Sequence, residues 1–176
     1  MNLKLFCTLI FSIFLFSACS AKYDNVDLNK KDYSSDEVKK MAEEIISISP
    51  KIDKKEAYAV SYDAITYSKV LANKYELTSP PLFHNFLVNI HVKERGLCYH
   101  FARDLLAYLQ TRNYKTFDFK RVVADKKGYF EHNAVLLTVK GLDLQESIVL
   151  DAWRNSGKLY ESKVKDDKDY IWELLK

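Results

Sequence analysis

Residues 96–112 read GLCYHFARDLLAYLQTR, and the fold is organised around this stretch. Its apolar side chains recur every three or four positions, at Phe101, Ala102, Leu105, Leu106 and Leu109. This spacing is the period of a helix with one buried face, so we expect a helix over about 97–112. Cys98 then lies in the first turn of that helix.

Four strand-like runs follow this helix, over 117–123, 132–139, 147–151 and 158–164. In the second run, apolar residues occupy both sets of alternating positions, which is typical of a largely buried strand. The turn Lys126-Lys127-Gly128 lies between the first two runs. These runs therefore predict a small antiparallel sheet.

Three helical segments come before residue 96, over 35–48, 53–75 and 82–92, the last of them a short helix or an irregular segment. Helices followed by antiparallel strands indicate the α+β class, with N-terminal helices packed on the sheet. We expect residues 34–176 to form one domain, because a chain of this length suits a single core.

The composition is that of an ordinary globular protein, with 48% hydrophobic and 29% charged residues. Only four Gly and three Pro argue against a disordered or fibrous chain. The formal net charge is +3 and no Lys/Arg cluster stands out, so we expect no nucleic-acid partner.

Residues 1–18 have the pattern of an export signal. Lys4 is the one positive charge of a short leading region, and the apolar run 5–16 follows it. A run of that length is too short to cross ~30 Å of hydrocarbon as a helix, but it suits a signal sequence. Small residues at Ser17 and Ala18 then fit a signal-peptidase site.

The tetrapeptide Phe16-Ser17-Ala18-Cys19 resembles the lipobox of bacterial lipoproteins. The resemblance implies that Cys19 is acylated and starts the mature chain, with the lipid membrane as its partner. Ser20 after the cysteine implies, by similarity to known sorting, an outer-membrane anchor facing the periplasm. An ordinary signal peptide cut near Ala21 is the alternative. Residues 19–33 are polar and aperiodic, so we expect a tether there.

Cys98 is then the one thiol that is neither in the signal nor lipidated. A helix N-terminus favours the reactive thiolate, an imidazole can pair with it, and a carboxylate can orient the imidazole. His132 begins one expected strand and Asp151 ends the next, so neighbouring strands could bring them together. Each residue alone is more often structural, but together they suggest a catalytic triad.

Gly96-Leu97-Cys98, His132 and Asp151-Ala152-Trp153 resemble the transglutaminase-like superfamily of papain-type cysteine enzymes. His132 follows Cys98 by 34 residues and Asp151 follows His132 by 19, and both separations are typical of that superfamily. The resemblance covers about 95–155. It implies a papain-like core in which Cys98 attacks, His132 transfers protons and Asp151 orients His132.

Beyond the triad, the sequence offers candidates for substrate binding and for an oxyanion donor. Trp153 and Arg154 either shape a pocket and bind a substrate carboxylate, or are respectively core and solvated. Asn89 and His91, with Tyr99, are the candidates for an oxyanion donor. No metal-ligand spacing is present, and we expect neither a metal nor a cofactor.

Three functions compete on this pattern. The first is a membrane-anchored cysteine hydrolase or acyl transferase acting on amide bonds of peptide or peptidoglycan. The second is a catalytically silent binding or scaffolding lipoprotein with the same fold. The third is a cell-wall endopeptidase that pairs a cysteine with two histidines, and Asp151 in the third position counts against it.

Overall fold

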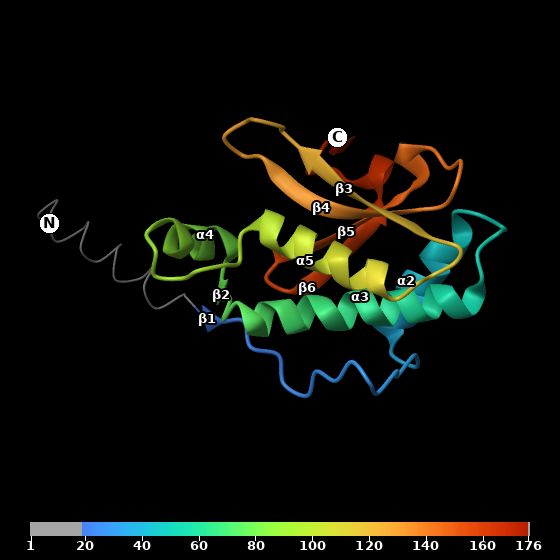
Figure 1. Cartoon of the computed structure of the whole chain (residues 1–176), viewed down its shortest axis with the longest axis horizontal. Coiled ribbons are helices and arrows are strands. Elements are labelled where there is room, and N and C mark those ends of the chain that lie inside the picture. Colours follow the sequence, from blue (N-terminus) through green and yellow to red (C-terminus); the bar gives the residue numbers. More distant parts are fainter. Residues whose placement is uncertain (1–18, 176) are drawn as a thin grey trace, which may run out of the picture.

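The computed structural model describes residues 19–175, in which four helices come before a five-stranded antiparallel sheet (Figure 1). The helices are α2 (Asp36–Ser47), α3 (Lys54–Lys74), α4 (Pro81–Asn89) and α5 (Cys98–Thr111). This arrangement confirms the α+β class and each helical segment expected from the sequence. None of the helices within 19–175 is both long and apolar enough to cross a membrane. The signal peptide predicted over 1–18 lies outside the described residues, and the structure does not test the lipid predicted on Cys19.

The sheet has the strand order β6-β5-β4-β3-β7. Its strands are β3 (Asp118–Ala124), β4 (His132–Thr138), β5 (Ile148–Asn155), β6 (Lys158–Lys163) and β7 (Glu173–Leu174), with short 3-10 turns at Leu144–Glu146 and Val164–Asp166. The four predicted strands are present, and β5 runs four residues further than expected. The sequence did not predict β7, because a two-residue strand carries no periodic signal of its own.

Both faces of the sheet are covered, and all seven residues of β4 are buried. On one face, α5 packs on β4 and β5, and α3 runs alongside α5 and packs on β6 and β5 (Figure 1). On the other face, Val164 and Trp172 of the C-terminal segment pack on Leu136 and Val149. Burial on both sides explains why β4 reads as an unbroken apolar run rather than as an alternating one.

The start of α5 is held by a buried histidine. The Nδ1 atom of His100 accepts hydrogen bonds from the backbone N–H groups of Gly96 and Leu97, at 3.2 Å each. Just before this turn, Gly96 has φ +122° and lies against the ring of His84. The backbone that leads into Cys98 is therefore fixed by two imidazole rings.

The segment predicted as a tether is seated on the helical layer. Strand β1 (Cys19–Ser20) pairs antiparallel with β2 (Thr78–Ser79), immediately before α4. Further along, the backbone of Tyr23 exchanges hydrogen bonds with the side chain of Asn73 at 2.8 and 2.7 Å. Residue 19 is therefore held at the domain surface.

Candidate active site

The three residues of the expected triad lie on three different elements of the core. Cys98 is the first residue of α5, His132 is the first residue of β4, and Asp151 lies within β5. The pairing of β4 with β5 places Val135 opposite Leu150, so Asp151 and His132 lie near the same ends of the two strands. The topology thus gathers residues that are far apart in the sequence.

His132 and Asp151 form a buried pair. The Nε2 atom of His132 lies 2.6 Å from Oδ2 of Asp151, and their side chains are only 3% and 1% exposed. Burial by itself lowers the pKa of His132. The Asp151 carboxylate, together with Cys98, outweighs this effect and raises the pKa of His132 to about 9. His132 is therefore an imidazolium at neutral pH, and Asp151 is its counter-ion.

Asp151 is itself held by a local irregularity of β5. The pairing of β5 with β6 shifts register between Asp151 and Asn155, and the carboxylate fills that irregularity. Its Oδ1 accepts the backbone N–H groups of Trp153 and Arg154 at 3.0 and 3.1 Å, and Arg154 Nε donates to Oδ2 at 3.0 Å. Burial raises the pKa of Asp151, but His132 and these Arg154 contacts lower it below its usual value. The carboxylate therefore stays ionised.

Aromatic rings enclose the His132 ring. The ring centroids of Tyr170, Trp153 and Trp172 lie 4.5, 5.0 and 5.5 Å from that of His132. Tyr170 and Trp172 come from the C-terminal segment, far from His132 in the sequence. These rings restrict rotation of the imidazole and keep water from the His132–Asp151 pair.

The Cys98 thiol faces the start of β4. Its Sγ lies 3.8 Å from the carbonyl oxygen of Glu131, next to His132, and the side chain is partly exposed. Because Nε2 of His132 is bonded to Asp151, Nδ1 is the ring atom left to interact with the thiol. Cys98 and His132 both line one cavity.

This cavity of about 450 Å³ lies between α4 and the loop that joins β3 to β4. Besides Cys98 and His132, its lining residues are Leu82, Asn85, Phe86, Asn89, Tyr129, Phe130, Glu131, Trp153 and Tyr170. Of the predicted substrate-binding residues, Trp153 and Asn89 line the cavity, whereas His91 and Arg154 do not. The α4 and loop residues were missed, because only the folded chain brings them opposite Cys98.

Arg154 was expected either to bind a substrate carboxylate or to be solvated, and the structure shows neither arrangement. Its guanidinium bonds Asp151 and also Asp167, at 2.7 Å between Nη2 and Oδ2. It lies 3.8 Å from the ring centroid of Tyr160 and 4.6 Å from that of Tyr170. Arg154 is thus neither solvated nor turned toward a substrate; it ties the C-terminal segment to the carboxylate that orients His132.

Asn85 is the polar group that sequence reasoning overlooked. The indole Nε1–H of Trp153 donates to Oδ1 of Asn85 at 3.3 Å. An indole nitrogen can only donate, so Asn85 must turn its oxygen toward Trp153, and its NH₂ group is left for another acceptor. Asn85 lines the cavity with Cys98, so it is a better candidate for the oxyanion donor than His91. His91 is exposed just after α4 and has φ +62°. Tyr99, the third candidate, is 41% exposed, and its ring lies tilted against that of His100 with 4.1 Å between the centroids.

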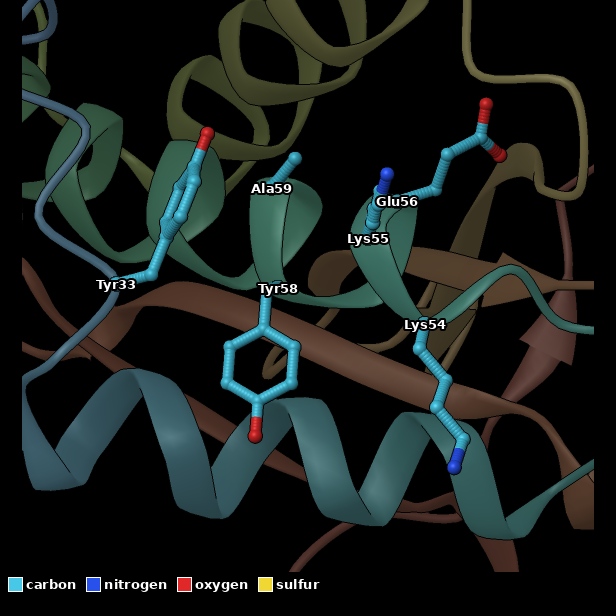
Figure 2. A pocket seen from close by; sticks show the side chains of 6 residues that line it. All are labelled: Tyr33, Lys54, Lys55, Glu56, Tyr58 and Ala59. Carbon is cyan, nitrogen blue, oxygen red and sulfur yellow. The ribbon is translucent and has the colours of Figure 1, made fainter.

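A larger hollow of about 580 Å³ lies along the first turns of α3, beside Tyr33. Figure 2 shows its side chains on two sides of the helix: Tyr58 and Lys54 extend to one side, and Tyr33, Lys55 and Glu56 extend to the other. The Glu56 carboxylate there already accepts the backbone N–H groups of Lys115 and Thr116. With no convergent reactive groups, this hollow is not the candidate active site.

Comparison with known proteins gives no match: no family model fits the chain, and no curated protein or solved structure is significantly similar to it. Across residues 19–175, no three His, Cys, Asp or Glu side chains are grouped as metal ligands. The functional assignment therefore depends on the geometry around Cys98.

Proposed function

We propose that this protein is a cysteine hydrolase or acyl transferase that acts on amide bonds of peptide or cell-wall material. The observation that carries the proposal is the shared cavity of Cys98 and His132, in which His132 is bonded to the buried Asp151. A thiol, an imidazole and a carboxylate in this order are the parts of covalent acyl transfer. We also propose that the core is papain-like and related to the transglutaminase-like superfamily.

The reaction begins from a Cys98 thiolate beside a His132 imidazolium. The sulfur attacks the substrate carbonyl carbon, and the carbonyl π electrons move onto oxygen. When this tetrahedral intermediate collapses, the C–N bond breaks and His132 gives its Nδ1 proton to the departing amine. Water or a second amine then attacks the thioester carbon, and His132 takes the proton of the attacking group. The second tetrahedral intermediate collapses, the C–S bond breaks, the acyl product leaves and Cys98 departs as the thiolate beside the His132 imidazolium. Asp151 holds Nε2–H throughout and keeps the ring oriented.

Two groups are placed to stabilise the oxyanion. The Cys98 N–H lies in the first turn of α5, where backbone donors have no carbonyl partner within the helix. The Asn85 NH₂ group faces the same cavity. Donors of this kind are worth about 10²- to 10³-fold in rate each.

The resemblance of residues 16–19 to a lipobox suggests where in the cell the protein is found. We propose that Cys19 is acylated and that the protein is a lipoprotein of the bacterial envelope, anchored in the outer membrane and facing the periplasm.

The first test is the rate of Cys98 alkylation by iodoacetamide against pH, in the wild-type protein and in His132→Ala. An ordinary thiol alkylates slowly below about pH 8.5, whereas an ion-paired thiolate remains reactive at pH 7. We expect the wild type to react at pH 7 and His132→Ala to lose that reactivity. Equal and slow rates in both proteins would contradict the mechanism and favour the silent scaffolding function.

The second test is turnover of p-nitrophenyl acetate, which reports acyl-enzyme formation and breakdown. We expect Cys98→Ala to abolish turnover, and Asn85→Ala to lower it by about 10²-fold or more. Asn89→Ala is the matched control, because Asn89 lies one helical turn further along the same cavity. A larger loss in Asn89→Ala than in Asn85→Ala would reverse the assignment of the oxyanion donor.

A further inference from the structure

Most of the exposed apolar side chains lie on the elements that border the catalytic cavity, and four of them, Leu82, Phe86, Tyr129 and Phe130, line it. Seven of the nine large apolar residues exposed within 19–175 lie on α4 and the turn after it, on the first turn of α5, or on the β3–β4 loop. We call these seven the apolar rim: Leu82, Phe86, Ile90, Val92, Tyr99, Tyr129 and Phe130. Exposed apolar groups gathered in one place mark an interaction surface, whereas scattered ones do not.

The part of the rim on α4 and the turn after it has no charged residue. Residues 81–92 contain no Asp, Glu, Lys or Arg, in a chain that is 29% charged overall. Leu82, Phe86 and Ile90 are four residues apart, so they form one stripe along α4. Across the cavity, Tyr129 is 94% exposed and Phe130 72% exposed. Both side chains line the cavity and are nevertheless largely exposed to solvent.

The rim lies beside the residue that is predicted to carry lipid. Cys19 pairs with Ser79 in the β1–β2 ladder, and α4 begins two residues later at Pro81. His84 joins this ladder to α4 and to the loop before Cys98, because Nδ1 accepts Thr78 N–H at 3.0 Å and Nε2 bonds the Arg95 carbonyl at 2.8 Å. Figure 1 shows β1, α4 and the β3–β4 loop at the same end of the molecule.

We propose that the apolar rim rests in the interfacial layer of the lipid bilayer when the acyl chains of Cys19 are inserted. The catalytic cavity then opens at the membrane surface and receives substrate there. This inference rests on the lipid anchor proposed above. The anchor holds the protein on the membrane, and the rim decides which way the domain faces.

Two physical arguments favour a bilayer as the occupant. Aromatic and aliphatic side chains concentrate at the membrane interface, where a helix buries its apolar face by about 5–10 Å. In addition, Cys19 is seated in β1, so its acyl chains enter the bilayer next to α4 and bring the rim into reach.

The experiment uses the full chain, expressed in a bacterium that processes lipoproteins and reconstituted into neutral phosphatidylcholine vesicles. Phe86→Trp places a reporter on the rim. Gln110→Trp places the control near the far end of α5, more than two helical turns beyond Cys98. The wild type gives the background emission of Trp153 and Trp172. Mass spectrometry of the mature N-terminus reports the lipid separately.

With brominated acyl chains, we expect Phe86→Trp to lose about half of its added emission, as an interfacial side chain should, and Gln110→Trp to lose almost none. Equal quenching of the two reporters, or none in either, in a chain shown to carry lipid would overturn the docking and leave the anchor intact. A chain without lipid would overturn the anchor, and the docking with it. The alkylation rate of Cys98 tests the proposed catalytic function separately, because it depends neither on the lipid nor on docking to the membrane.

Discussion

Nε2 of His132 lies 2.6 Å from Oδ2 of Asp151, across two neighbouring strands of the sheet. Both side chains are almost completely buried, so their attraction is little screened by water. The proton on Nε2 is therefore held toward Asp151, and Nδ1 is directed to the side of Cys98. The chemistry proposed for the cavity depends on this one contact.

Replacing Asp151 with Asn tests that dependence. The side chain keeps its shape, but loses the charge that raises the pKa of His132 to about 9. We expect this pKa to fall toward or below the ordinary value of about 6.5, and acylation by p-nitrophenyl acetate to fall by about 10²- to 10⁴-fold. The NMR titration of His132 measures the first change. Asp143→Asn, at an exposed turn, is the control, and an unchanged His132 titration in Asp151→Asn would refute the pairing.

Arg154 should contribute to stability more than a surface arginine does. Its side chain is 11% exposed and joins the buried carboxylates of Asp151 and Asp167. Arg154→Met leaves both carboxylates without this partner, so we expect the free energy of unfolding to fall by about 3 kcal/mol in urea titration. Lys165→Met, which removes an exposed ion pair with Glu146, should change it far less. Similar losses in the two variants would contradict the role assigned to Arg154.

Comparing Gly96→Ala with Gly141→Ala distinguishes the cost of steric overlap from the cost of backbone strain. Both glycines have positive φ, +122° and +86°, but a Cβ on Gly96 would lie 2.2 Å from Nε2 of His84, whereas a Cβ on Gly141 meets nothing within 4 Å. We expect Gly141→Ala to cost about 1–2 kcal/mol of unfolding free energy from strain alone, and Gly96→Ala clearly more. Because Gly96 leads into Cys98, only Gly96→Ala should also slow alkylation. Equal costs would show that the His84 ring moves aside freely.

The buried His100 should make the stability of the protein depend on pH in mild acid. Burial and the nearby Arg95 and Arg103 lower the pKa of His100 to about 4. Between pH 4 and about 6.5 the unfolded chain binds a proton there that the folded chain does not, so stability should fall as the pH is lowered through this window. Burial lowers the pKa of His84 as well, with the same sign. Thermal unfolding against pH measures the loss.

His100→Gln is the matched variant for this window, because an amide oxygen can still accept the N–H groups of Gly96 and Leu97. Its stability should decline less steeply below pH 6.5 than that of the wild type. His132 has the opposite sign. Its pKa is raised, so its contribution is complete below about pH 6.5 and is lost as the pH rises through about 9. If the stability of His100→Gln fell as steeply below pH 6.5 as that of the wild type, His100 would be excluded as the cause of the fall.

The sequence by itself determined the elements and their order. The three- to four-residue apolar period of 98–109 and the apolar run of 132–139 are local signals, and α5 and β4 are found there. The same local signals placed Cys98 at a helix start and His132 at a strand start. Two strands joined in sequence were then enough to predict that His132 and Asp151 are neighbours.

Only the tertiary structure decided what surrounds those residues. The roles of Asn85 and Arg154, the β7 pairing and the seating of residues 19–33 all come from contacts between segments far apart in the chain. Such contacts leave no period in the sequence, because each depends on where a second element is placed by the shared core. Secondary structure follows from neighbours along the chain, whereas a cavity forms only where separate elements meet.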